Sequence, residues 1–160
     1  MALKASPTLR RTCRTCRSKR SKSRYPIRVE SYGFRPNSGG AGEFRGGLGL
    51  TRSYRLLAEE AVLQLRADRT DHPPYGLFGG LPGAPSRNFI CEAGGTLRPL
   101  PGKTTMRITR GTLVLHEQAG GGGYGAPQKR DRHALNDDVQ NGKITGKAAA
   151  KSYGRKADRI

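Results

Sequence analysis

The sequence predicts a mainly β domain of the α+β class, with a glycine-rich sheet of short strands followed by two short C-terminal helices. The first observation is composition, because 23 glycines and 10 prolines in 160 residues favour tight turns over long helices. The second is periodicity, because short stretches of alternating or continuous apolar residues recur between turn-forming stretches. The third is that the apolar residues after the glycine run at 120–125 have the spacing of a helix face.

Six segments have the pattern of strands. In residues 26–33, Ile27 and Val29 lie on one side and Arg28 and Glu30 on the other, which predicts a strand with one buried face. The close spacing of the six segments, with turn-forming residues between them, favours an all-β core over alternating βαβ units. The other five predicted strands are residues 50–57, 61–67, 88–93, 105–109 and 112–118.

Turn-forming residues separate these strands. Residues 35–49 hold six glycines, which predicts a tightly folded loop or successive bulges. The prolines of residues 72–85 cannot donate ladder hydrogen bonds, and the glycines there let the chain reverse. Residues 94–103 and 110–111 are also predicted as turns.

Two helices are predicted after the last glycine run. The second is capped by Thr145, runs through Tyr153 and ends at Gly154. The first has an apolar face formed by Ala134, Leu135 and Val139, and it stops at Asn141-Gly142.

The formal charge of +18 is uneven. Residues 1–24 carry nine Lys or Arg and no acid, with little apolar surface to bury, so we expect a disordered basic head that attracts nucleic acid only non-specifically. Residues 25–155 are predicted to form the domain and residues 156–160 a tail. No apolar run approaches the roughly 20 residues that span a bilayer, so no membrane partner is expected. Three cysteines form no disulfide framework, which favours the cytoplasm.

No catalytic or metal-binding residue is predicted. Cys13 and Cys16 have the spacing of half a zinc site, but a structural site needs four ligands and the other candidates are isolated. A nucleophile–base signature accompanies none of the histidines, which we expect to be hydrogen-bonded or exposed, although a triad is recognised by geometry rather than by sequence order. The adjacent carboxylates 59–60 and 137–138 are expected on solvated faces.

Two glycine-containing patterns resemble nucleotide motifs only in part. Gly120-x-Gly122-x-x-Gly125 is followed by Pro127 and charged residues where a phosphate-binding helix should begin. Residues 101–104 lack the first glycine of a phosphate loop and are predicted as a β-turn.

The runs at residues 38–42 and 120–125 have another possible use. Their backbone N–H groups could form concave nests that hold an anion such as a phosphate, with an arginine such as Arg52 adding charge. The alternative is that both runs are tight turns packed against their neighbours. The anion-binding candidates are Ser38, Gly39, Gly40, Arg45, Gly121, Gly122 and Arg130.

Several blocks, in order, resemble the B-type subunits of hydantoinases and 5-oxoprolinases. They are YPIRVESYGFRPNSGGAGEFRGGLGLTRSYR, PYGLFGGLPG, RPLPGK and GGGGYGAPQKRD, with DVQNGKITGKAAAKSYG like the family's C-terminal tail. The resemblance implies ATP-dependent opening of a cyclic amide ring by a complete enzyme, with a hydantoinase A/oxoprolinase-type partner and a possible divalent metal. It also implies that this chain is a C-terminal fragment, inactive without the N-terminal part or the partner.

A small basic nucleic-acid-binding protein is the alternative function. The head supplies positive charge, but it lacks interleaved aromatic residues, and the body shows no RNA-stacking signature.

Overall fold

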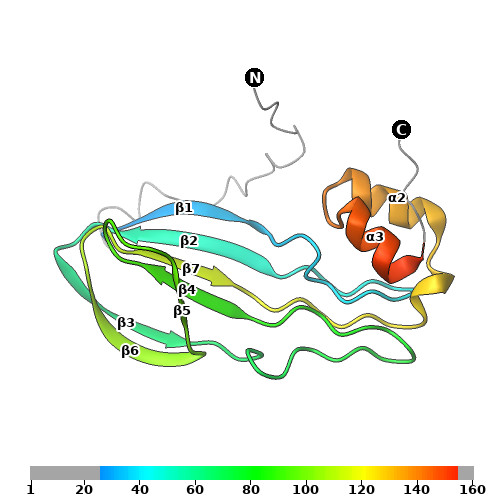
Figure 1. Cartoon of the computed structure of the whole chain (residues 1–160), viewed down its shortest axis with the longest axis horizontal. Coiled ribbons are helices and arrows are strands. Elements are labelled where there is room, and N and C mark those ends of the chain that lie inside the picture. The colour runs from blue at the N-terminus through cyan, green and yellow to red at the C-terminus, as the bar shows by residue number, and fades with distance from the viewer. Residues whose placement is uncertain (1–25, 155–160) are drawn as a thin grey trace, which may run out of the picture.

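The computed structural model describes residues 26–154 and confirms the mainly β prediction, with antiparallel strands first and two helices last. Figure 1 shows the strands at one end of an elongated molecule and the helices at the other. The elements are β1 (Ile27–Phe34), β2 (Leu50–Leu56), β3 (Glu60–Arg66), β4 (Arg87–Cys91), β5 (Arg98–Leu100), β6 (Lys103–Thr109), β7 (Leu113–Glu117), the 3-10 turn η2 (Pro127–Lys129), α2 (Arg132–Gln140) and α3 (Gly146–Tyr153).

The strands form two sheets. Five strands make an antiparallel sheet in the order β1-β2-β7-β4-β5, and β3 pairs with β6 in a separate two-stranded sheet. Their apolar faces share one core, which removes apolar surface from water and so holds the sheets together. The buried core residues are Leu56, Leu63, Ile90, Leu100, Ile108 and Val114.

Strand β1 lies at an edge of the larger sheet and buries less than its alternation predicts. Ile27 packs against the core, but Val29 is 46% exposed. The pairing with β2 shifts between Val29 and Ser31, so Glu30 sits at a bulge. Of the two apolar residues predicted to share a buried face, Ile27 therefore packs against the core and Val29 does not.

Strand β5 corrects the prediction of a turn over residues 94–103. Residues 98–100 pair with β4, and Leu100 is buried opposite Asn88. The neighbouring glycines and prolines hide this strand in the sequence. Pro99 is tolerated because β5 is the outermost strand of its sheet, where one side of the backbone needs no partner.

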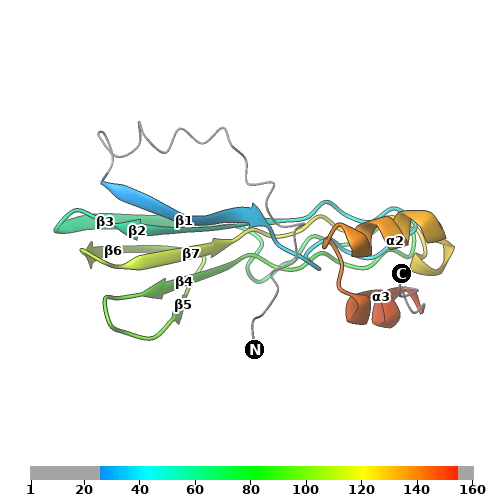
Figure 2. The ribbon, with the colours of Figure 1, turned by 90° about the horizontal axis from the view of Figure 1, so that it is seen from above.

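Three irregular segments extend from the sheet toward the helices, and we call residues 35–49, 74–85 and 118–126 together the glycine bundle. They are not independent tight loops, because backbone hydrogen bonds join them, such as Leu81 N–H to Ala41 O at 2.7 Å and Gly123 N–H to Leu81 O at 2.9 Å. A Cβ built on Gly120 would overlap the carbonyl oxygen of Ser38. Glycine is needed there for this close approach of two backbones. Figure 2 shows the segments running together from the sheet to α2 and α3.

Both helices end where predicted, and α3 has its predicted cap at Thr145, whereas the cap of α2 at Asp131 was not predicted. The Asp131 carboxylate accepts from Ala134 N–H at the start of α2, and the Thr145 hydroxyl accepts from Ala148 N–H at the start of α3. Gly154 ends α3 in the left-handed conformation, at φ 65°. A second core lies between these helices and the bundle. Its buried residues are Ala41, Leu135, Ile144, Ala149 and Tyr153.

Within residues 26–154, neither α2 nor α3 has the length and apolar character that a membrane-spanning helix requires.

Candidate functional site

The two glycine runs singled out in the sequence lie side by side in the glycine bundle. Gly40 N–H donates to Gly121 O at 2.8 Å, and Gly121 N–H donates to Gly47 O at 2.8 Å. Gly39 and Gly122 occupy the same bundle, Gly39 against the backbone of Gly46 in its own segment and Gly122 against the backbone of Tyr75 in another. The structure therefore brings these candidates together, with the amides of Gly40 and Gly121 already bonded to carbonyl oxygens.

The side chain of Ser38 also makes its hydrogen bonds within the bundle. Its hydroxyl donates to Arg35 O at 2.6 Å and accepts from Gly49 N–H at 2.8 Å, and the residue is buried. These two bonds close the loop that carries the first glycine run. Anion binding by the glycine runs stays a prediction.

The two candidate arginines converge on one carboxylate, which belongs to Asp138 of α2. Arg45 Nε lies 3.0 Å from Asp138 Oδ2 and its Nη2 lies 3.3 Å from Oδ1, a bidentate pair. Arg130 Nη2 lies 2.5 Å from Oδ2, and Lys143 Nζ lies 3.4 Å from Oδ1. We call these four residues the Asp138 cluster.

This cluster is largely shielded from water. The exposed fractions of the side chains are 5% for Asp138, 10% for Arg130 and 14% for Arg45, while Lys143 is 42% exposed. Burial by itself would raise the pKa of the Asp138 carboxyl. The hydrogen bond and charge of Arg45, followed by Arg130 and Lys143, outweigh burial, so the pKa is lowered overall. Asp138 is therefore a carboxylate at neutral pH, and it connects helix α2 to the bundle.

Asp138 overturns the expectation that both acids of the pair 137–138 face solvent. Asp137 is exposed, but Asp138 is buried. A signal was available, because Asp138 follows Ala134 by four positions and Leu135 by three, which puts it on the predicted apolar face of the helix. A lone acid on such a face indicates a buried ion pair, and Arg45 and Arg130 are its partners.

Hydrogen bonds from the cluster to backbone carbonyls also connect distant parts of the chain. The two arginines also donate to the bundle, Arg45 Nη1 to Gly46 O at 2.6 Å and Arg130 Nη1 to Glu43 O at 3.2 Å. The guanidinium of Arg130 lies 5.9 Å from the ring centre of Tyr153, close enough for a cation–π contact. Burial raises the pKa of the Tyr153 phenol. Beside Tyr153, a cavity of about 130 Å³ separates α3 from residues such as Ala41 and Leu81 of the bundle.

Arg52 does not join this cluster. It lies on β2 opposite His116 of β7, within the sheet. The His116 Nδ1 atom lies 2.5 Å from Asn88 Oδ1, and burial, with a smaller effect of Arg52, lowers the pKa of the imidazole. His72 and His133 are exposed, which is one of the two environments expected for the histidines.

The nucleotide-like patterns take other structures. Gly120, Gly122 and Gly125 belong to the bundle and lead into the 3-10 turn η2 rather than a phosphate-binding helix. Gly102 lies in the bend between β5 and β6, where its carbonyl accepts from Ala67 N–H.

Metal-binding side chains do not gather in the described part of the chain. Across residues 26–154, no group of three or more His, Cys, Asp and Glu side chains could hold a metal ion. Cys91 Sγ lies 3.2 Å from Gly95 O. Cys13 and Cys16, the half zinc site considered from the sequence, lie outside the described residues.

Comparison with known proteins relates this arrangement to one family. Residues 21–127 match the family model described as Hydantoinase B/oxoprolinase. The chain is 39% identical over 132 residues to the uncharacterized protein MJ0963 of Methanocaldococcus jannaschii, covering 82% of this chain and 23% of that protein. It is 32% identical over 135 residues to the B-type subunit of a putative D-/L-hydantoinase from a Pseudomonas species, covering 83% of this chain and 23% of that protein. It is 33% identical over 105 residues to 5-oxoprolinase 1 of Arabidopsis thaliana, covering 66% of this chain and 8% of that protein.

Two solved structures share the fold. The nucleotide-free structure of an acetone carboxylase superimposes with a TM-score of 0.73 at 20% identity, covering 86% of this chain and 22% of that one. The ATP-dependent caprolactamase from Pseudomonas jessenii gives a TM-score of 0.72 at 25% identity, covering 86% of this chain and 24% of that one. The chain thus spans about a quarter or less of the length of the proteins it matches.

Proposed function

The chain belongs to the hydantoinase B/oxoprolinase family, and from this membership we propose that it is the C-terminal structural part of a B-type subunit whose complete enzyme opens cyclic amide rings with ATP. The observation that carries the proposal is the family match over residues 21–127, which contain both sheets and the glycine bundle. Relatives named for 5-oxoproline, hydantoin and caprolactam support the substrate class, because all three compounds contain a cyclic amide.

We propose that these residues support the reaction without breaking the bond themselves. The bundle and the Asp138 cluster hold the helices and the sheet in one fixed arrangement, as a structural part requires. Arg45 and Arg130, two largely shielded cations beside the glycine runs, bind the protein's own Asp138. Because both cations already pair with Asp138, we assign ATP use to a hydantoinase A/oxoprolinase-type partner. Two relatives, one named for a hydantoinase and one for caprolactamase, are each named as a single subunit of their enzyme, which supports such a partner.

Reconstitution tests this proposal. The full chain is purified with an A-type subunit and with the B-type residues that its relatives contain in addition, and ATP hydrolysis and ring opening are measured with 5-oxoproline, a hydantoin and caprolactam. We expect ATP-dependent ring opening of at least one of the three compounds by the assembled mixture, and a loss of that activity when this chain is omitted. Equal activity with and without this chain would contradict the proposal.

A cytoplasmic setting is part of the proposal, in keeping with a cysteine composition that forms no disulfide framework. We attribute any binding of nucleic acid to residues 1–24, which lie almost wholly outside the family match. Deleting those residues should abolish the binding of duplex DNA at low salt. Unchanged DNA affinity in the deletion would instead favour a nucleic-acid-binding body.

A further inference from the structure

The cavity beside α3 has about the volume of one small ring. It measures about 130 Å³ and lies between α3 and two segments of the glycine bundle, 35–49 and 74–85. An apolar protein cavity of about 150 Å³ holds a single benzene molecule, so one small ring is about the largest ligand that this space encloses. No residue of the Asp138 cluster lines the cavity, which is therefore distinct from that cluster.

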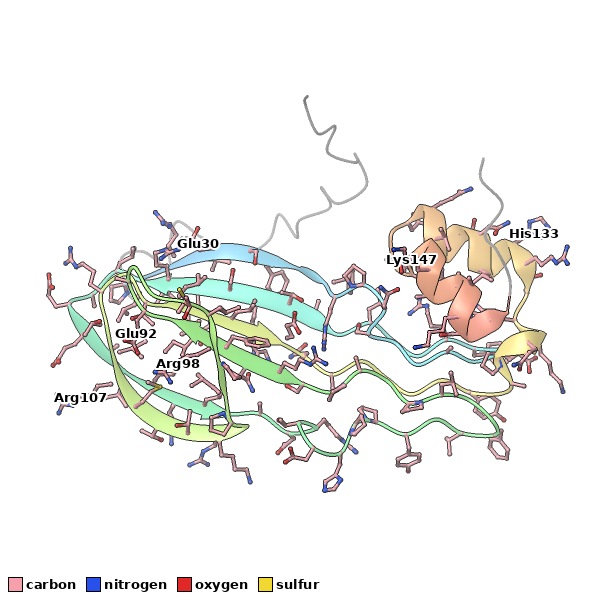
Figure 3. All side chains as sticks on the ribbon, in the orientation of Figure 1. Glu30, Glu92, Arg98, Arg107, His133 and Lys147 are labelled. Carbon is pink, nitrogen blue, oxygen red and sulfur yellow. The ribbon has the colours of Figure 1, made fainter. Side chains whose placement is uncertain are left out.

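Aliphatic side chains form most of the lining, with contributions from Ala41, Leu81, Ile144 and Ala148. None of the described residues that line the cavity carries a charge. Figure 3 shows several charged side chains at the sheet end of the molecule, remote from this cavity, namely Glu30, Glu92, Arg98 and Arg107. A ligand carboxylate buried against such a lining would lose its hydration and gain no ion-pair partner there. The lining therefore favours an uncharged ligand.

The hydroxyl of Tyr153 supplies a hydrogen-bond donor that the fold leaves unused. Tyr153 lines the cavity and is 3% exposed, and its hydroxyl has no hydrogen-bond partner among the described residues. The N–H of Gly42 lies near the phenol oxygen without the geometry of a normal hydrogen bond, and it is a donor as well. Burial raises the pKa of the phenol, so the hydroxyl keeps its proton at neutral pH. A buried donor without an acceptor is costly, and a ligand carbonyl oxygen would remove that cost.

Two further polar side chains, Asn37 and Ser152, belong to the lining. The backbone N–H of Asn37 donates to Lys143 O at 3.0 Å, and its Oδ1 accepts from Thr145 N–H at 2.8 Å. These two bonds fix Asn37 against the start of α3. The hydroxyl of Ser152 both donates and accepts. Aliphatic walls with a few hydrogen-bonding groups are typical of a site for a small molecule.

The walls of the cavity are formed before any ligand enters. Leu81 N–H donates to Ala41 O at 2.7 Å, which joins the two bundle segments that line the cavity. The opposite wall is α3, which is capped by Thr145 at its start and ended by Gly154. A ligand that enters such a fixed space orders few protein groups, so little of its binding free energy is lost to conformational entropy.

We propose that this cavity binds an uncharged cyclic amide, with the ring against the aliphatic walls and the carbonyl oxygen accepting the hydrogen bond of Tyr153. The amide N–H of the ligand would donate to the hydroxyl of Ser152. This inference rests on the proposed function and narrows it, because it selects neutral cyclic amides such as caprolactam over the anionic 5-oxoproline. A cyclic amide combines an apolar ring with one donor and one acceptor, which matches the lining.

The test is an NMR titration of the full-length chain with caprolactam. We expect saturable binding with a Kd of about 1 mM, because so small a ligand makes few contacts. Ala148→Leu fills the cavity and should weaken binding at least about ten-fold. The matched control is Ala150→Leu, which adds the same side chain to an exposed position of α3 and should bind within about two-fold of the wild type. Tyr153→Phe removes only the hydroxyl and should weaken binding about five-fold.

Two other compounds separate the parts of the proposed recognition. At neutral pH, 5-oxoproline should bind at least about ten-fold more weakly than caprolactam, because its carboxylate finds no cation in the lining. Cycloheptanone has the ring size and the carbonyl group of caprolactam but lacks the N–H, and it should bind about five-fold more weakly. The melting temperature of each variant is measured alongside, and Tyr153→Phe still decides the question if Ala148→Leu does not fold.

Several outcomes would overturn the inference. They are no saturable binding of caprolactam, equal affinity of the wild type for caprolactam and 5-oxoproline, unchanged affinity in Tyr153→Phe or in folded Ala148→Leu, and loss of caprolactam binding when the other B-type residues are added.

The test is separable from the enzymatic proposal. Binding of caprolactam in the cavity without ring opening of any cyclic amide by the assembled mixture would refute the proposed function alone. Ring opening of caprolactam with unchanged kcat and KM by an assembly that carries Ala148→Leu would refute the cavity site alone.

Discussion

Replacing Asp138 by asparagine tests the electrostatic connection between the helices and the bundle. Asp138→Asn keeps the shape of the side chain and removes its charge, which leaves Arg45 and Arg130 facing each other at exposed fractions of only 14% and 10%. Breaking a buried ion pair by removing one partner costs roughly 3–5 kcal/mol. Lys143 is 42% exposed and water screens it, and the amide oxygen of asparagine still accepts a hydrogen bond, so we expect about 3 kcal/mol.

The assay is thermal and urea unfolding of the full chain, followed by circular dichroism. A loss of about 3 kcal/mol should lower the melting temperature by roughly 10 °C in a chain of this size. The matched control is Asp137→Asn, which alters the exposed neighbour and should leave the free energy of unfolding within about 0.5 kcal/mol of the wild type. Equal stability of the two variants would refute the reasoning.

The pH dependence of the same protein gives an independent check. The pKa of Asp138 is lowered in the folded state, so its carboxylate contributes stability above its pKa in the unfolded chain, which is about 4. That contribution is lost as the pH falls through the lower folded value. Asp138→Asn should therefore weaken the dependence of stability on pH in this acidic range.

Three further predictions rest on the same geometry. Gly46→Ala should destabilise the fold by about 1–3 kcal/mol, because a Cβ there overlaps Gly121 O. In the control Gly47→Ala the added Cβ meets nothing within 4 Å, so the free energy of unfolding should change little. Equal melting temperatures of the two variants would contradict the close packing of the bundle. Burial lowers the pKa of His116, so stability should decrease as the pH falls below about 6.5, and an imidazole titration by NMR with a midpoint at or above this value would show the expectation to be wrong. An anion at the glycine runs must compete with Asp138 for Arg45, so Asp138→Asn should bind inorganic phosphate about ten-fold more tightly than the wild type. If calorimetry detects phosphate binding by neither protein, that result would count against the predicted anion site.

Local signals in the sequence were sufficient where neighbouring residues determine the structure. Alternating apolar residues located six of the seven strands in residues 26–154, and Thr145 and Gly154 marked the ends of α3 because capping involves only nearby backbone groups. The division of the strands into two sheets depends instead on distant partners. Strand β5 has only three residues and contains Pro99, so it exists because Leu100 reaches the core opposite Asn88.

The glycine bundle and the Asp138 cluster could not be derived from local patterns alone. Glycine density signals that side chains are excluded, but it does not say which backbone approaches, and here Gly40 meets a segment about 80 residues further along the chain. The sequence did identify Arg45 and Arg130 as charges beside the glycine runs. It did not pair them with Asp138, since the pairing depends on how α2 packs against the bundle.

The activity of the full chain by itself tests the central claim most directly, that this part of the family fold supports bond breaking carried out elsewhere. Purified chain is incubated with Mg²⁺-ATP and 5-oxoproline, a hydantoin or caprolactam, and ring-opened product is measured by mass spectrometry. We predict no product above the rate in protein-free buffer. Sustained, ATP-dependent formation of a ring-opened product by the isolated chain would contradict the claim.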